Sequence, residues 1–344
     1  MGSVEKAKIE VEKRMPEASE KVKAEIVSDM VNMAKCYHYD YDEYFYFHFR
    51  EKSLKERLAF FPDILQRNVV RSFNKGTNQY LFDDKGSCAN RFKKYFKRDY
   101  CVVYKTWPKS IIKKSSSELM NFISKHPRFI VKPLASGCGN GVKIYNIANY
   151  SSEESMVDDL LNEYCKGLLG GFICEELIEQ DARMAAFHPS SVNTVRITTV
   201  KFPDRVEAIH AFMRTGQKGN IVDNGGAGGL LCTIDMSSGT VIASADENGV
   251  FYTKHPDSGL DLVGFTIPLW EEAVKLAKEL ALVVKGNRYA GWDLALTKDK
   301  EWVMVEGNSM GQFVGWQIPT QKGFRDELNH ILKELHLKTY FVKV

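Results

Sequence analysis

Two apolar stretches near the carboxyl end of the sequence carry polar side chains that a folded sheet would bring together. Residues 291–296 (GWDLAL) contain Asp293, and residues 303–308 (VMVEGN) contain Glu306 and Asn308. Each stretch is typical of a buried strand, and Glu306 and Asn308 are two apart, so they point to the same face of a strand. Three hard oxygen ligands without sulfur or imidazole match a Mg²⁺ site that keeps room for water and phosphate oxygens. A hairpin with polar ends is the alternative.

A glycine-rich loop lies upstream, after a short apolar strand predicted at residues 129–133 (FIVKP). This strand contains Lys132, and the alternate glycines that follow would let backbone N–H groups approach phosphates closely. It is not a Walker A loop, because the lysine precedes the glycines, and no helix pattern follows as a dinucleotide-binding fold requires. The pattern favours a mobile β-hairpin over phosphates, with an ordinary tight hairpin as the alternative. The loop residues expected at the nucleotide are Ser136, Gly137, Gly139 and Gly141.

Residues 171–180 (GFICEELIEQ) are the third element, a predicted strand with a polar exit. Such a strand can offer backbone N–H and C=O groups to the edge of an adenine, and an acid to its amino group or to the ribose. Alone, this pattern has little specificity. The order of the three elements along the chain is far more specific than any one of them.

This order of elements resembles the ATP-grasp superfamily over roughly residues 80 to 320. Other stretches are similar to a bacterial branch described as sugar-transfer-associated or alpha-L-glutamate-ligase-related. Members of that branch tend to be found with capsule and cell-surface polysaccharide genes. The resemblance implies an ATP-grasp fold, in which two α/β lobes sandwich ATP, and the activity of a carboxylate–amine ligase. The stretches that carry the branch resemblance are residues 188–196, 222–226, 255–259 and 267–270.

The resemblance also implies roles for individual residues. Two lysines would hold the phosphates, and Lys85 and Lys132 lie 47 residues apart, similar to the spacing in D-alanine–D-alanine ligases. Lys105 is the alternative to Lys85. Asp293, Glu306 and Asn308 would be the Mg²⁺ ligands. The implied adenine hinge and its neighbours are Glu175, Glu176, Leu177 and Ile178, with Asp181 near the ribose and Asn224 near phosphate or metal.

We expect an α+β fold class with four regions. Residues 1–76 are a helical, aromatic-rich N-terminal region that departs from the α/β domain expected before ATP-grasp lobes. Residues 77–127 would form an α/β linker lobe, residues 128–178 a lid lobe with the glycine-rich loop, and residues 179–344 a C-terminal lobe with the metal site. The aromatics of residues 37–49 indicate a packed helical subdomain, with a sugar-stacking or partner surface as the alternative.

One amphipathic helix is predicted from Lys85 onward, with aromatic side chains on its apolar side. Its opposite face is basic. We interpret that face as solvated, and contact with an anionic glycan or membrane surface is the alternative. The basic face comprises Arg91, Lys93, Lys94, Lys97 and Arg98.

Composition argues against several classes of protein. A formal net charge of +3 is nearly balanced, unlike that of a nucleic-acid-binding protein. Seven cysteines without a C-x-x-C pair support neither a disulfide scaffold nor a zinc site. The charged start lacks the apolar segment of a signal peptide, and no run of about 18 apolar residues occurs. We therefore expect a cytoplasmic protein whose partners are ATP and two small molecules, a carboxylic acid and an amine.

The expected chemistry needs no nucleophile from the protein. The substrate carboxylate attacks the γ-phosphorus of ATP, and an amine then attacks the acylphosphate. Catalysis is mostly positioning and charge neutralisation by Mg²⁺, lysines and arginines. A phosphotransferase with a hydroxyl acceptor and a non-catalytic nucleotide-binding module are the two alternatives.

Four further residues are candidates for this chemistry. Arg214 follows a predicted strand and would stabilise the oxyanion or the acylphosphate. Arg196 and Asn193 would bind a substrate carboxylate, although Arg196 could instead be an exposed or ion-paired arginine. His255 would act as general base on the amine, or is an ordinary loop histidine.

Overall fold

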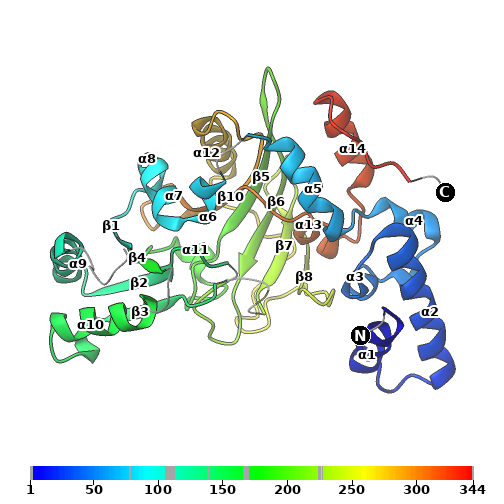
Figure 1. The fold of residues 1–344 in the computed structure, drawn as a ribbon, viewed down its shortest axis with the longest axis horizontal. Helices are drawn as coiled ribbons and strands as arrows, with labels where there is room; N and C mark the ends of the chain where they lie inside the picture. Colours follow the sequence, from blue (N-terminus) through cyan, green and yellow to red (C-terminus); the bar gives the residue numbers. More distant parts are fainter. Residues whose placement is uncertain are drawn as a thin grey trace.

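The computed structural model describes residues 3–76, 79–104, 113–137, 139–165, 170–223, 226 and 228–342. Within these ranges the strands form two antiparallel sheets (Figure 1). The smaller sheet contains β1 (Tyr100–Tyr104), β2 (Arg128–Pro133), β3 (Lys143–Asn146) and β4 (Gly171–Glu176), in the order β1-β4-β2-β3. The larger sheet, in the order β10-β9-β5-β6-β7-β8, contains β5 (Val195–Lys201), β6 (Val206–Thr215), β7 (Leu230–Ile234), β8 (Val241–Ala245), β9 (Tyr289–Leu296) and β10 (Trp302–Asn308).

The helices fall into groups that follow the chain. The N-terminal group comprises α1 (Ser3–Arg14), α2 (Glu20–Tyr37), α3 (Tyr41–Tyr46), the 3-10 helix η1 (Phe49–Glu51), α4 (Leu54–Ala59) and α5 (Asp63–Phe73). The middle group comprises α6 (Tyr80–Asp83), α7 (Lys85–Arg91), α8 (Lys93–Phe96), α9 (Lys113–Lys125), the 3-10 helix η2 (Ile147–Asn149), α10 (Glu153–Tyr164) and α11 (Ala182–Ala185). The last group comprises α12 (Trp270–Val283), α13 (Val314–Thr320) and α14 (Arg325–Glu334). No helix among the described residues is both long and apolar enough to cross a membrane.

The smaller sheet has its own apolar core. Leu119 of α9 and Leu160 of α10 are completely buried with Phe129 of β2 and Phe172 of β4. Alternation along β2 directs every second side chain toward these helices, which leaves the other face of the strand open toward the larger sheet. The expected hairpin forms, with Val131 of β2 paired to Lys143 of β3 around the glycine-rich loop.

The larger sheet is covered on both faces, as in Figure 1, and its central strands are therefore apolar on both sides. Every residue of β9 is buried. Helix α12 covers one face through a core that includes Trp292 of β9. On the other face, Tyr289 of β9 packs with Phe73 of α5, Phe313 and Phe324.

The N-terminal helices pack against the edge of the larger sheet that ends in β8. Phe47, Phe49 and Phe60 are buried in one cluster with Ala245 of β8 and Ile318 of α13. The aromatics predicted to fill a helical subdomain do so, through edge-on and tilted contacts of their rings. The predicted α+β class with a helical N-terminal region is confirmed.

The single helix predicted from Lys85 onward is wrong, because the chain breaks at Phe92 into α7 and α8. The ring of Phe92 is completely buried among the apolar residues under the larger sheet, and it contacts Trp292. The helix is interrupted where the Phe92 ring packs into the core, so tertiary packing overrides the local helical pattern there.

Candidate functional site

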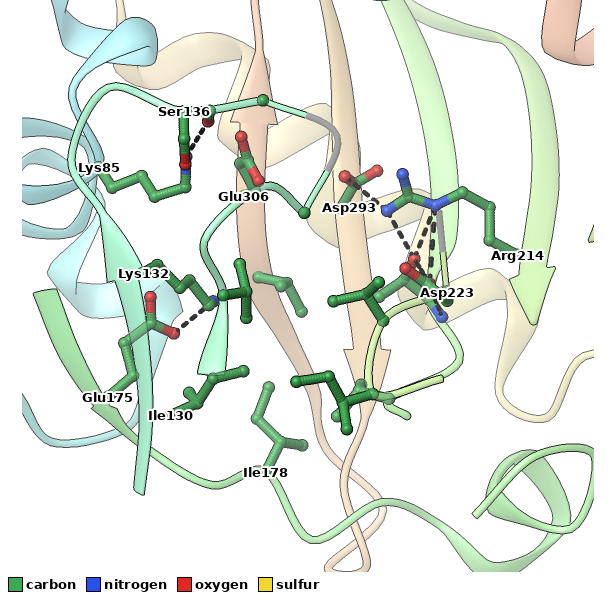
Figure 2. A pocket seen from close by; sticks show the side chains of 18 of the residues that line it. Lys85, Ile130, Lys132, Ser136, Glu175, Ile178, Arg214, Asp223, Asp293 and Glu306 are labelled. Carbon is green, nitrogen blue, oxygen red and sulfur yellow. Dashed lines mark hydrogen bonds and ion pairs between the residues drawn. The ribbon is translucent and has the colours of Figure 1, made fainter. Parts of the chain in front are cut away.

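A cavity lies between the two sheets, bordered by the β2–β3 hairpin on one side and by β9 and β10 on the other. Figure 2 shows charged side chains toward one end, including Lys85, Glu306 and Asp293, and apolar ones such as Ile130 and Ile178 toward the other. Most of the predicted site residues line it: Lys85, Lys132, Ser136, Gly137, Gly139, Glu175, Glu176, Leu177, Ile178, Arg196, Arg214, Asp293, Glu306 and Asn308.

Two lysines from different elements lie at the cavity, one on the hairpin and one on a helix (Figure 2). Lys132, on β2, donates to Oε2 of Glu175 over 2.8 Å, and Lys85, the first residue of α7, donates to the backbone carbonyl of Ser136. Each ammonium group has three N–H donors, so both lysines keep donors for another partner. The alternative lysine, Lys105, lies outside the described residues.

Glu175 is the buried anion that orients Lys132. Burial opposes its charge, but Arg98 and Lys132 outweigh burial and hold the pKa of its carboxyl below the usual value. Arg98 donates to Glu175 over 2.6 Å and to the carbonyl of Met304 on β10 over 2.7 Å. One guanidinium group therefore joins the two sheets beside the cavity.

Arg98 is the exception to the predicted solvated basic face, because its side chain is only 5% exposed. The other four residues of that face are exposed. Local sequence gave no signal for the role of Arg98. Its partner Glu175 lies 77 residues further along the chain, and only the fold brings the two together.

The glycines of the loop adopt conformations that other residues avoid. Gly139 and Gly141 have φ angles of +71° and +75°, in the left-handed region where a Cβ atom is unfavourable. A Cβ atom on Gly141 would also lie 2.8 Å from Cγ of Pro133. Gly141 shapes the hairpin from outside the cavity lining, whereas Gly137 and Gly139 face the cavity.

Asp293 is the centre of a buried ion network. Arg196 is its neighbour on β5 and donates to both carboxylate oxygens, over 2.6 and 2.7 Å. Arg214 of β6 donates to Oδ2 over 2.8 Å (Figure 2). Burial opposes the charge of Asp293, but the two arginines keep the pKa of its carboxyl below the usual value. Arg196 is therefore ion-paired, and it also lines the cavity.

Two residues that sequence reasoning missed extend this network. The hydroxyl of Thr194 accepts from Arg214 over 2.9 Å and donates to Asp223. Asp223 also accepts from the backbone N–H of Thr194 over 2.9 Å. Both line the cavity. Both lie in stretches that carry the branch resemblance, residues 188–196 and 222–226, but a threonine at a strand entrance and an aspartate in a loop are common surface residues, so neither was assigned a role in the site.

The predicted metal ligands meet at one edge of the cavity. Glu306 is paired in register with Asp293 across β9 and β10, and Asn308 lies two residues further along β10. Among the described residues, the side chains of Glu306 and Asn308 have no hydrogen-bond or ion-pair partner. Hard oxygen donors without protein partners fit a Mg²⁺ ion. Asp293 fits with its remaining lone pairs only, because two arginines share its oxygens.

Besides Gly141, three predicted residues are placed away from the cavity lining. Asn193 is completely buried and donates to the carbonyls of Met184 and His188. His255 is buried, with Nε2 2.8 Å from the carbonyl of Gly216, and burial lowers its pKa. Asp181 has no exposed surface and is bound to Arg183 and Lys300. Asn224, predicted near phosphate or metal, lies outside the described residues.

Several solved structures match this chain at low sequence identity. N5-carboxyaminoimidazole synthetase from Staphylococcus aureus, complexed with ADP, is 10% identical with a TM-score of 0.40, over 68% of this chain and 46% of that chain. An L-amino acid ligase from Bacillus licheniformis is 14% identical with a TM-score of 0.40, over 68% and 44%. The ATP-grasp ligase PsnB, complexed with precursor peptide PsnA2 and AMPPNP, is 12% identical with a TM-score of 0.44, over 77% and 62%.

This chain spans about half the length of several of the solved proteins that it matches. No protein of curated function matches its sequence. A family model described as sugar-transfer-associated ATP-grasp matches residues 65–333, which is most of the chain. The resemblance found from the order of sequence motifs is thereby confirmed. The chain belongs to the sugar-transfer-associated ATP-grasp family.

Proposed function

We propose that the protein is an ATP- and Mg²⁺-dependent carboxylate–amine ligase that forms an amide through an acylphosphate and releases ADP and phosphate. One observation carries this proposal. A single cavity is bordered by two lysines and a glycine-rich loop on one side, and by three oxygen ligands and two arginines on the other. This arrangement suits a triphosphate whose terminal phosphoryl group is transferred.

The nucleotide would lie along the cavity with its adenine at the apolar end. Ile130, Leu177 and Ile178 offer apolar surface there, and the backbone after β4 offers hydrogen-bonding groups to the base edge. Lys132 and Lys85 would then use their remaining N–H donors on phosphate oxygens. Glu175 keeps Lys132 in place because it is itself fixed by Arg98.

Glu306, Asn308 and Asp293 would hold Mg²⁺ at the phosphate end. When bound, the ion neutralises phosphate charge and orients the terminal phosphoryl group. Arg196 and Arg214 already point to the same edge, so the acid substrate would place its carboxylate beside them. Their planar guanidinium groups match a carboxylate or an acylphosphate.

The substrate carboxylate oxygen attacks the γ-phosphorus, and the bond from that phosphorus to ADP breaks. The amine then attacks the acyl carbon, and phosphate leaves with the oxygen that the carboxylate supplied. The amine loses one proton to phosphate or solvent. Arg214 would bind the oxyanion of the second step, because Asp293, Thr194 and Asp223 hold its guanidinium group beside the cavity.

The nucleotide part of the proposal is tested by calorimetry of Mg·ATP binding. Lys132→Ala should weaken affinity by about tenfold or more, because it removes a charged phosphate ligand. Lys143→Ala is the matched control, since Lys143 is on the same hairpin but is paired with Glu163 at the surface. Equal affinities in these two variants would contradict the proposed ATP site.

The reaction is tested by product analysis with hydroxylamine as the amine. A panel of carboxylic acids is incubated with Mg·ATP, and the expected products are ADP, phosphate and a hydroxamate. Formation of AMP and pyrophosphate would remove the protein from this class of ligases. A stable phosphorylated hydroxyl product would instead support a phosphotransferase, and ATP binding without turnover of any acid or alcohol would support a nucleotide-binding module.

A further inference from the structure

A second cavity adjoins the nucleotide cavity on the side of the N-terminal helices. It has a volume of about 710 Å³, within the range of small-molecule sites. Gly137, Arg196, Arg214 and Asn308 line both cavities. A molecule in the second cavity would therefore reach the phosphate end of the first, where an acyl group must meet the γ-phosphate.

The N-terminal region supplies one wall of this second cavity. Helix α5 contributes Gln66, Arg67 and Arg71, and α3 contributes Asp42 and Tyr46. Phe212 of β6 and Ile318 of α13 also line it and are apolar. In Figure 1, α5 lies beside the larger sheet and α13, at the same side as the start of the chain. The region that sequence comparison left without a role thus borders the expected acid site.

Arginines outnumber carboxylates in the lining of this cavity. Five arginines and three carboxylates line it. Arg196 and Arg214 are paired with Asp293, and Arg14 is paired with Glu10 and Asp42. Among the described residues, Arg67 and Arg71 have no hydrogen-bond or ion-pair partner.

Arg67 and Arg71 are suited to act together. They are four residues apart on α5, so they lie on one face of the helix at neighbouring positions. Gln66, beside Arg67, is buried and fixes the helix to the larger lobe by donating to the carbonyl of Gly311 over 2.9 Å. Two guanidinium groups on an anchored helix can receive a phosphate or carboxylate by paired hydrogen bonds.

We infer that the acid substrate carries a second anionic group, and that Arg67 and Arg71 bind this group while the reacting carboxylate lies beside Arg196 and Arg214. This inference rests on the proposed ligase function and names the class of its acid substrate. The nearby carboxylates are Asp42, Asp63 and Glu247, which line the same cavity. They would repel a second anion placed away from the two arginines, and so restrict where it binds.

The test uses three acids with the same six-carbon chain: gluconate, glucarate and 6-phosphogluconate. They differ only in the group at the end opposite the reacting carboxylate, which is a hydroxyl, a carboxylate or a phosphate. Binding to the full-length protein with Mg·ADP is measured by calorimetry. At least one of the two probes with a second anionic group, glucarate or 6-phosphogluconate, should bind about tenfold more tightly than gluconate. Tighter binding of 6-phosphogluconate than glucarate would identify the second group as phosphate, and the reverse as carboxylate.

Variants of Arg67 and Arg71 test whether these residues cause the preference for a second anionic group. Arg67→Gln and Arg71→Gln should each reduce the preference for the probe with a second anionic group and leave Mg·ADP affinity unchanged. Arg50→Gln is the control, because Arg50 is an exposed arginine of the N-terminal region outside this cavity. Equal affinity for all three probes, absence of binding, or a preference that persists in the Arg67→Gln/Arg71→Gln double variant would overturn the inference.

This measurement is separate from the test of the reaction. Probe binding requires no turnover, so a missing preference for a second anionic group refutes the substrate class alone. A failure to form ADP and hydroxamate refutes the ligase reaction, whatever the probes do.

Discussion

At the scale of single residues, the site is organised by charges that compensate one another away from water. Arg196, Asp293, Arg214 and Asp223 alternate in sign along one network. A buried charge is tolerated when partners and hydrogen bonds replace its water. Glu306 differs, because it lines the cavity without a partner among the described side chains. Its charge is available to a ligand, whereas that of Asp293 also supports the fold.

This difference predicts distinct results for two isosteric variants. Glu306→Gln should abolish ADP formation and leave the free energy of unfolding within about 0.5 kcal/mol of wild type. Asp293→Asn should abolish activity too, but should cost roughly 3–5 kcal/mol of stability, because it leaves two buried guanidinium groups undercompensated. Turnover assays measure the activity of the two variants, and denaturant unfolding measures their stability. If the two variants were equally stable, Asp293 would not have the structural role assigned to it.

At the scale of elements, the sequence predicted local structure well and contacts poorly. Short apolar runs predicted the strands around Lys132 and Asp293, because a strand inside a covered sheet carries few polar residues. The break at Phe92 and the buried pairing of Arg98 with Glu175 were missed. Both depend on neighbours distant in sequence, and no local periodicity records them.

The strand β4 holds the smaller sheet together, since it pairs with both β1 and β2. It begins at Gly171, which has a φ angle of +143°. A Cβ atom there would lie 2.5 Å from the carbonyl oxygen of Val103 on β1. Gly171→Ala should therefore destabilise this sheet by about 1–3 kcal/mol, with faster hydrogen exchange at β1 and β4.

Gly137→Ala provides the control for this prediction. No atom lies within 4 Å of the position that its Cβ would occupy, and its φ angle is not positive. The stability of Gly137→Ala and the hydrogen exchange of its strands β1 and β4 should match those of wild type. Exchange in Gly171→Ala that is no faster than in this control would show that the sheet relaxes around the added methyl group.

At the scale of the whole molecule, the candidate site depends on regions that are far apart in the chain. The order of motifs identified the family, and most of the ligands predicted from it line one cavity. It did not predict that Asn193, His255 and Asp181 lie away from the cavity lining, because a polar residue beside a motif can equally well pair with other polar groups of the protein. Nor did it indicate that the N-terminal helices border a cavity, since that wall is formed by tertiary packing.

The N-terminal helices are joined to the rest of the molecule by buried polar contacts as well as apolar ones. The side chain of Asn74 donates to the carbonyl of Tyr289 over 2.9 Å, and Gln317 accepts from the backbone of Phe61 over 2.8 Å. Arg325 donates to the carbonyl of Leu58 over 2.6 Å. These bonds cross between segments more than 200 residues apart, and they replace water at buried groups.

Gly323 lies at this junction and gives a test of its importance. A Cβ atom there would lie 2.1 Å from the backbone carbonyl of Ala59 at the end of α4, and backbone cannot move aside as a flexible side chain can. Gly323→Ala should therefore cost about 1–3 kcal/mol or more, as overpacked sites do. Because the N-terminal helices share buried contacts with β8 and α13, calorimetry should show one unfolding transition at a lower temperature. Two separate transitions would mean that the helices are an independent unit, and the acid site could not then rely on them for a fixed wall. The melting temperature of wild type would instead show that the junction relaxes around the added methyl group.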